Sequence, residues 1–169
     1  MTDEQRVPFD REGYERRARS GTCFVCAIVR SDPEYPAHVI WRDEHHIAFL
    51  NRWPTLRGYS VLAPIEHRED VVRDVGLEEH LRLQTVLHRL GRAIAVVVPT
   101  ERLYVLSLGS KQGNSHVHWH LAPLPPGTPY GEQQYAALNA EVAGILSPSD
   151  HEQTRVAADI AAAFLRTTS

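Results

Sequence analysis

Residues 115–122 read SHVHWHLA, and this alternation of polar and apolar side chains decides the expected fold of the chain. Successive side chains along a β-strand point to opposite faces of its sheet. His116, His118 and His120 are therefore expected on one face, about 6.6 Å apart by the strand rise, with the apolar residues between them turned toward a core. A row of imidazoles is costly to bury without partners, so it favours a site for a metal or for anionic oxygens.

Working outward from this strand, short runs of strand-forming residues predict four more strands, over residues 38–42, 46–50, 59–64 and 102–108. Apolar residues that recur every three or four positions predict a long helix over residues 75–98, with Asp74 as its N-cap. They are Leu83, Leu87, Leu90, Ile94 and Val97. Strands gathered around one long helix predict an α+β fold with a five-stranded antiparallel sheet.

Both ends of the chain are expected to lie outside this domain, which spans residues 21–124. Residues 1–20 carry mixed charges without an apolar period, which predicts a mobile arm or a loosely docked turn of helix. Residues 125–169 predict a C-terminal extension with one or two helices. The first would bury a stripe and the second would begin with a capping box. These residues are Tyr135, Leu138, Val142 and Ile145 for the stripe, and Ser149 with Glu152 for the box.

The composition limits the classes of protein that need to be considered. The chain has 169 residues, of which 43% are apolar, so we expect one packed core. A net charge of −3 with 23% charged residues does not predict binding to nucleic acid or to membranes. No apolar run approaches the ~20 residues that cross a bilayer, and a soluble cytoplasmic protein is the expectation. The two cysteines form a CxxC, which is more typical of a metal or redox site than of a disulfide framework.

The chemistry of imidazole connects the histidine row to phosphoryl transfer. A neutral histidine presents one lone-pair nitrogen as a nucleophile, while a backbone carbonyl can hold the proton on the other nitrogen. His118 has a neighbour on each side, and His116 and His120 could donate protons to phosphate oxygens or to a leaving group. The preceding turn is rich in glycine and in hydrogen-bond donors, which suits an oxyanion. It contains Gly109, Ser110, Gln112, Gly113, Asn114 and Ser115.

Several motifs together resemble the histidine triad (HIT) superfamily. HVHWHLA is similar to the signature of that family, and residues 47–67, IAFLNRWPTLRGYSVLAPIEH, are similar to its ribose-contacting segment. Within that segment, NRWP is similar to the fragile histidine triad branch, while CFVC at residues 23–26 is similar to the CxxC of many bacterial members. The resemblance covers residues 21–124 and leaves the arm and the C-terminal extension outside it.

The resemblance implies a reaction and a set of site residues. The middle histidine of the triad, here His118, would attack the α-phosphate of a nucleotide and form a nucleotidyl-histidine intermediate that water then hydrolyses. Asn51 would contact the ribose hydroxyls, and Gln112 would contact phosphate. The implied substrate is a dinucleoside polyphosphate or a nucleoside phosphoramidate with adenine as its expected base. A homodimer is implied as well, and no redox cofactor is needed.

The resemblance also implies a zinc site and one change among the phosphate contacts. Two thiolates and two imidazoles are a usual tetrahedral set for structural zinc, and in this sequence the matching residues are Cys23, Cys26, His67 and His116. His116 would then be a metal ligand rather than a proton donor. Gly113 stands where the family usually has Ser or Thr, and Asn114 or Ser115 could supply the missing donor.

Four other interpretations stay open at this point. The same fold permits nucleotidyl transfer to phosphate or to a sugar phosphate in place of water. The protein could instead be a nucleotide-binding sensor or adaptor with little turnover. His-x-His pairs on strands also bind metals, which would give a metal-dependent hydrolase. Finally, the strand could be a histidine-rich amphipathic strand without a site.

Overall fold

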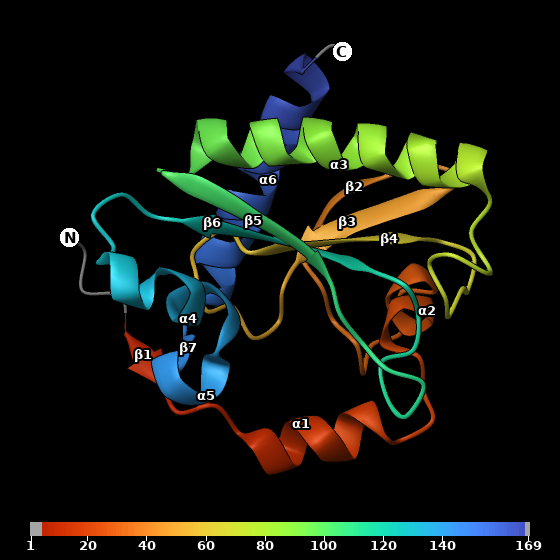
Figure 1. Ribbon diagram of the computed structural model, residues 1–169, viewed down its shortest axis with the longest axis horizontal. Helices are drawn as coiled ribbons and strands as arrows, with labels where there is room; N and C mark the ends of the chain where they lie inside the picture. Colours follow the sequence, from red (N-terminus) through yellow and green to blue (C-terminus); the bar gives the residue numbers. More distant parts are fainter. Residues whose placement is uncertain (1–4, 168–169) are drawn as a thin grey trace.

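A five-stranded antiparallel sheet forms the centre of the structure, a computed structural model that describes residues 5–167 (Figure 1). Its strands lie in the order β2-β3-β4-β6-β5, and every neighbouring pair is antiparallel. The α+β class and the five-stranded sheet predicted from the sequence are confirmed. The strands are β2 (Val39–Arg42), β3 (His46–Leu50), β4 (Ser60–Pro64), β5 (Arg102–Ser107) and β6 (Trp119–Leu124).

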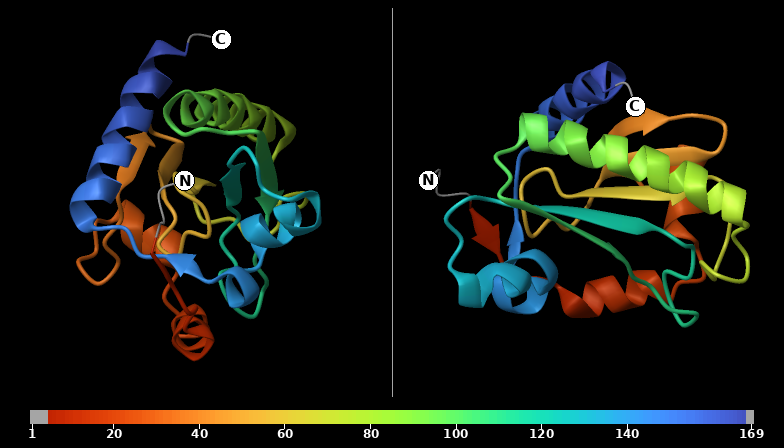
Figure 2. Two further views of the ribbon diagram at one scale, coloured as in Figure 1. Left: turned by 90° about the vertical axis from the view of Figure 1, so that its left-hand side faces the viewer. Right: turned by 45° about the horizontal axis from the view of Figure 1, so that its top comes forward.

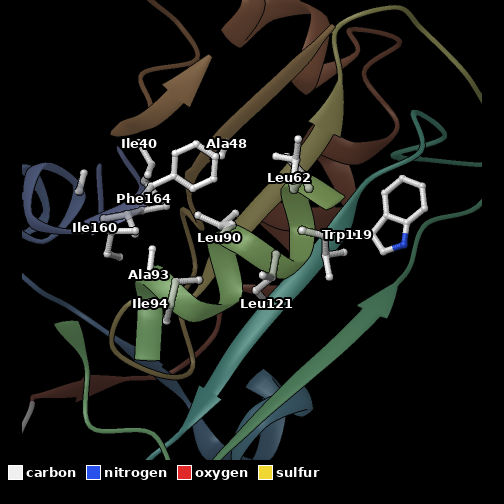
Figure 3. Packing of buried hydrophobic residues seen from close by; sticks show 14 of the residues in the cluster. Ile40, Ala48, Leu62, Leu90, Ala93, Ile94, Trp119, Leu121, Ile160 and Phe164 are labelled. Atoms are coloured by element: carbon white, nitrogen blue, oxygen red, sulfur yellow. The ribbon is translucent and has the colours of Figure 1, made fainter. Parts of the chain in front are cut away.

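Two long helices, α3 (Leu77–Val97) and α6 (Asp150–Arg166), cover one face of the sheet (Figures 1 and 2). Figure 3 shows the core between these layers, where Leu62 and Leu121 of the sheet meet Leu90 of α3 and Phe164 of α6. The expected apolar face of the long helix is buried at Leu83, Leu87, Leu90 and Ile94, and Val97 is partly buried. Because side chains alternate along strands, the opposite face of the sheet is left for other elements.

The long helix begins at a different residue from the one expected. Its N-cap is Gly76, and no side chain of the described residues caps it. The carboxylate of Asp74 instead accepts hydrogen bonds from the backbone N–H groups of Glu69 and Asp70, at 3.1 and 2.9 Å. Asp74 therefore closes the turn that precedes the helix, because its side chain is directed to those two N–H groups and not to the first helical turn.

Shorter elements pack on the other face of the sheet. Helix α2 (Phe24–Val29) lies against β3 and β4, where Val25 packs with Phe49 and Val61. Helix α4 (Gln133–Leu138) lies beside β6, with Ala137 buried in a small cluster. In Figure 1 these helices stand on opposite sides of the lower half of the molecule, and helix α1 (Arg11–Ala18) runs beneath them.

The N-terminal arm is joined to the C-terminal extension by a two-stranded ribbon. Strand β1 (Arg6–Val7) pairs antiparallel with β7 (Ile145–Leu146), and the guanidinium of Arg6 donates to the carbonyls of Thr55, Ala143 and Gly144. The expected arm thus contains a two-residue strand and a helix of eight residues, while residues 1–4 of it and residues 168–169 of the extension lie outside the described part of the chain. No helix among residues 5–167 is long and apolar enough to cross a membrane.

The first C-terminal helix differs from the prediction, whereas the second agrees with it. The segment is divided into a 3-10 turn (Tyr130–Glu132), α4 and α5 (Ala140–Ala143), because the side chain of Asn139 accepts from the N–H of Val142 and starts a new helix. Tyr135, Leu138 and Val142 of the expected stripe are exposed, so the stripe does not face the core. Ser149 caps α6 as expected, and Val156, Ile160 and Phe164 are buried. The carboxylate of Glu152 binds Arg57.

Candidate functional site

The first two histidines of the triad precede the strand on which they were expected. Strand β6 begins at Trp119, so His116 and His118 lie in the extended segment that leads into it. The N–H of Val117 donates to the carbonyl of Arg68 at 2.6 Å, which holds this segment against a loop 49 residues earlier in the chain. Because its backbone is paired outside the sheet, the strict alternation of a strand does not apply to residues 115–118. As expected, Val117, Trp119 and Leu121 are buried.

His118 is held in one tautomer by its own backbone. Its Nδ1 lies 2.6 Å from the carbonyl oxygen of His116, which accepts only if Nδ1 carries the proton. The lone pair is then on Nε2. The side chain is 4% exposed, and burial lowers the pKa of His118 below the ordinary histidine value, so the imidazole is neutral. A neutral ring with one free lone pair is the form that acts as a nucleophile.

His120 lies next to the ring of His118. The centroids of the two rings are 4.8 Å apart, and the ring of Tyr59 lies 5.7 Å from that of His120 on the other side. Burial lowers the pKa of His120 to about 3, with a further contribution from His118. Its Nδ1 has no hydrogen-bond partner among residues 5–167. A phosphate bound beside this ring would favour its protonated form, and would make it a proton donor.

Both rings line a cleft of about 740 Å³ on the face of the sheet opposite α3 and α6. Its walls combine aromatic rings with polar groups, as small-molecule sites do. Phe24 forms part of the wall, and its ring centroid lies 5.2 Å from that of His118 and 6.4 Å from that of Phe49. Further lining residues are Ile28, Tyr35, Val61, Gly109 and Leu146.

The structure brings two of the four predicted nucleotide-binding residues to this cleft. Asn51 and Asn114 line it. Gln112 is exposed on the turn before the triad, and its backbone N–H donates to Ser110. The hydroxyl of Ser115 donates to the carboxylate of Glu69 at 3.0 Å, and this carboxylate also contacts His67, one of the predicted metal ligands. Neither Gln112 nor Ser115 is among the described residues that line the cleft.

Helix α1 is part of this site, which the sequence did not indicate. The amide of Asn114 donates to the hydroxyl of Tyr14 at 2.8 Å, and the ring of Tyr14 lies 5.3 Å from that of Trp53. A Cβ on Gly113 would come within 3.1 Å of the carbonyl oxygen of Ala18. Gly113 stands where the resemblance implies Ser or Thr, and its lack of a side chain allows the helix to approach the turn. This departure is the sequence feature that could have indicated the contact.

His116 belongs to a second cluster, with Cys23, Cys26 and His67. One ligand atom from each of these residues lies within 4.8 Å of the other three. Nδ1 of His116 is 3.3 Å from the sulfur of Cys23 and 3.6 Å from that of Cys26, and Nδ1 of His67 is 3.4 Å from the sulfur of Cys26. Tetrahedral zinc with Zn–S and Zn–N bonds of ordinary length separates such ligands by about 3.5 Å, so the donor set fits this metal.

The surroundings of the cluster also suit a metal. Nε2 of His116 lies 2.9 Å from the carbonyl of Pro64, and Nε2 of His67 lies 3.3 Å from the carboxylate of Glu69. Carbonyl or carboxylate partners of this kind fix the tautomer that turns Nδ1 toward a metal. Burial raises the pKa of Cys23 to about 11, so this thiol keeps its proton at neutral pH until a cation replaces it.

Comparisons with known proteins identify the family. Profiles of known protein families give no match. An uncharacterised HIT-like protein of Methanocaldococcus jannaschii is 31% identical over 112 residues, which cover 62% of this chain and 81% of that protein. The chain belongs to the histidine triad family. The HIT fold is supported independently by the crystal structure of a zinc-bound histidine triad family protein from Mycobacterium smegmatis, with a TM-score of 0.67 and 24% identity over 87% of this chain and 96% of the other.

Another relative has a named activity. The adenosine 5'-monophosphoramidase of Schizosaccharomyces pombe is 25% identical over 134 residues, which cover 72% of this chain and 96% of that protein. In the chain described above, the triad, the segment that contains Asn51 and the CxxC motif can all be recognised in the sequence. The contribution of helix α1 to the cleft is visible only in the structure.

Proposed function

We propose that this HIT protein hydrolyses a nucleoside phosphate derivative, either a dinucleoside polyphosphate or a nucleoside phosphoramidate, through a nucleotidyl intermediate on His118. The proposal rests above all on the contact between Nδ1 of His118 and the carbonyl of His116, because it provides a neutral imidazole with its lone pair on Nε2 in the wall of a cleft. The activity named for the fission yeast relative supports a phosphorus-containing substrate and adenine as the base.

The reaction takes two steps. Nε2 of His118 bonds to the α-phosphorus, and the bond from phosphorus to the leaving group breaks with its electron pair. A proton from His120 neutralises the leaving group. Water then attacks the phosphorus and gives a proton to His120, while the bond from phosphorus to Nε2 breaks with its electron pair and releases the nucleoside monophosphate. Asn51 contacts the ribose and Asn114 the phosphate, while Gln112 and Ser115 reach the nucleotide only if the turn moves.

We also propose that the cluster of Cys23, Cys26, His67 and His116 binds zinc. Two observations support this, the spacing of the donor atoms and the zinc bound to the mycobacterial HIT protein of similar fold. A bound zinc would supply a structural cross-link between α2 and the segment that carries the triad. His116 would then hold His118 through its carbonyl while its ring is a ligand, and would not act as a proton donor.

A homodimer through β5 is the third part of the proposal. This strand lies at the edge of the sheet, so one side of its backbone has no neighbouring strand among the described residues. Val105 on β5 is 44% exposed, and Val96 at the end of α3 is exposed as well. Edge strands with apolar side chains are sites of association. Light scattering should give twice the mass of the chain, and Val105→Lys should give the mass of one chain.

Trapping of the intermediate tests the mechanism. The protein is mixed with adenosine phosphoramidate or diadenosine triphosphate, quenched in alkali and analysed by mass spectrometry. We expect an adenylyl group on the peptide that contains His118, and none in His118→Ala. His45→Ala, which removes an exposed histidine outside the cleft, should behave as the wild type. Full turnover in His118→Ala would refute the mechanism, and tight binding of AMP without any turnover would favour a sensor.

A further inference from the structure

Two arginines from separate segments line the cleft, and the proposed chemistry does not use them. Arg17 lies on helix α1, three residues after Tyr14 and on the same side of the helix. Arg52 follows Asn51 in the loop after β3. Each guanidinium lies over an aromatic ring, with Cζ of Arg17 5.1 Å from the centroid of Tyr35 and Cζ of Arg52 5.5 Å from that of Trp53.

No carboxylate in the described part of the chain neutralises these two charges. Among residues 5–167, neither Arg17 nor Arg52 has an acidic side chain within ion-pair distance, and the hydrogen bond of Arg17 goes to the carbonyl of Glu34 at 3.5 Å. Two acidic residues line the cleft, but each has another partner. Glu141 pairs with Arg11 at 3.2 Å, and Asp150 pairs with His38 at 3.4 Å.

The two guanidiniums carry like charges in the wall of one cleft. Partial burial lowers the pKa of Arg52 below the ordinary arginine value, and the charge of Arg17 lowers it further. Arginine nevertheless stays protonated at neutral pH. Two like charges that face one cleft raise its positive potential, and an anion placed between them would remove the repulsion.

Helix α1, which carries Arg17, contacts the turn that leads to His118. Tyr14 accepts a hydrogen bond from Asn114, and Ala18 packs on Gly113, so residues before and after Arg17 in the helix contact this turn. The edge contact between the rings of Tyr14 and Trp53 connects the same helix to the loop of Arg52. The pair therefore belongs to segments that contact each other and the turn before His118, and both arginines line the cleft that His118 lines.

We propose that Arg17 and Arg52 form a second anion-binding subsite, which accepts the negatively charged group that a substrate carries beyond the phosphorus attacked by His118. The inference rests on the proposed function and narrows its substrate class to nucleotides with an anionic phosphate leaving group, such as dinucleoside polyphosphates. In that reaction the bond from Nε2 to phosphorus forms as the bridging P–O bond breaks. The electron pair leaves on a phosphate group, whose charge the two guanidiniums neutralise.

A comparison of substrates with the same nucleoside tests the subsite. The ratio of kcat/KM for diadenosine triphosphate to that for adenosine phosphoramidate is measured in the wild type, Arg17→Gln, Arg52→Gln and the double variant. We expect each single change to lower this ratio about tenfold and the double change to lower it more, because each removes one charge-assisted contact. Arg16→Gln is the matched control, since Arg16 is the adjacent residue on α1, is exposed and does not line the cleft.

Binding measurements keep this test independent of catalysis. By calorimetry, the affinity of the wild type should rise from AMP to ADP to ATP, and the double variant should bind all three with nearly equal affinity. Arg17→Lys and Arg52→Lys should restore part of the difference, because a lysine keeps the charge and loses the planar fork. If no substrate is hydrolysed, the proposed function is refuted. The binding series still tests whether the two arginines bind the additional phosphates.

Three results would overturn the inference. The first is an equal loss for both substrates in the arginine variants. The second is a loss of activity that differs between adenine and guanine substrates with the same number of phosphates. That result would assign the two arginines to base recognition. The third is a lowered melting temperature in Arg17→Gln with unchanged selectivity, which would assign Arg17 to the packing of α1.

Discussion

Nδ1 of His118 lies 2.6 Å from the backbone carbonyl oxygen of His116, and the ring of His116 belongs to the cysteine and histidine cluster. One residue thus connects the candidate metal site to the candidate nucleophile, with its side chain in the first and its carbonyl at the second. Any change that displaces His116 should therefore alter the tautomer and the position of His118 as well as the stability of the fold.

Removal of the metal should lower both stability and activity. We expect about one zinc per chain as purified, and less than a tenth of that in Cys23→Ser. Loss of a structural zinc costs several kcal/mol, so the melting temperature should fall by about 10 °C or more. Elemental analysis and calorimetry measure the two quantities. Ser20→Ala, which changes a neighbouring exposed residue outside the cluster, should leave both unchanged, and an unaltered zinc content in Cys23→Ser would contradict the assignment.

His120→Ala should slow the reaction according to the leaving group. A general acid contributes about 10²-fold or more when the leaving group is basic, and little when it departs readily. The rate with an adenylyl ester of an alkyl alcohol should therefore fall at least that much, while the rate with the p-nitrophenyl ester of AMP should fall less than tenfold. Steady-state kinetics on the two esters provides the measurement. Equal losses would show that His120 positions the nucleotide rather than donating a proton.

The burial of His120 should make the protein less stable in acid. Its pKa falls from 6.5 in the unfolded chain to about 3 in the folded protein. The unfolded state therefore binds more protons between these values, so this contribution to stability is complete above pH 6.5 and is lost as the pH falls. For this residue alone the loss is about 2 kcal/mol between pH 6.5 and pH 5. Urea unfolding at these pH values should show a smaller loss of stability in His120→Gln. The same dependence of the unfolding free energy on pH in both proteins would show that the ring does not remain neutral.

Gly109→Ala should be more harmful than the same change at Gly127. Both glycines have a positive φ, which costs an alanine about 1–2 kcal/mol. At Gly127 the new Cβ meets nothing within 4 Å among the described residues, whereas at Gly109 it would lie 2.5 Å from the carbonyl oxygen of Asn114 and 3.5 Å from the ring of His118. We expect Gly127→Ala to keep full activity and Gly109→Ala to lose most of it. Steady-state kinetics and urea unfolding of both variants under the same conditions test this difference.

Sequence patterns predicted the features whose causes are local. The apolar period of α3 and the runs of strand-forming residues in β3, β4 and β5 depend on neighbours within a few residues, and the boundaries predicted for these elements agree with the structure to within two residues. The CxxC and the triad supplied the cluster members and the cleft histidines. The prediction of Asp74 as the N-cap of α3 was wrong, because its side chain closes the turn at residues 69–74 instead of capping the helix that follows.

Features with distant causes could not be predicted in this way. The segment before β6 is not part of the sheet, and the N–H of Val117 in it donates to the carbonyl of Arg68, 49 residues earlier in the chain. The division of the stripe from Tyr135 to Val142 has a local cause, the side chain of Asn139, which an apolar period does not record. The contact between Tyr14 and Asn114 joins residues 100 positions apart. No local period records such a contact, so α1 was expected to be an arm and not a wall of the site.

The short ribbon formed by β1 and β7 makes the two peripheral segments of the chain depend on each other. Each contributes two residues to a ribbon that has no other strand among residues 5–167, so the removal of either one would leave the other with unpaired backbone groups. Among relatives, the leading and trailing segments should accordingly have been retained or discarded together. A shortened form that keeps only residues 21–124 would present its histidines to open solvent on the side where α1 and α5 now lie.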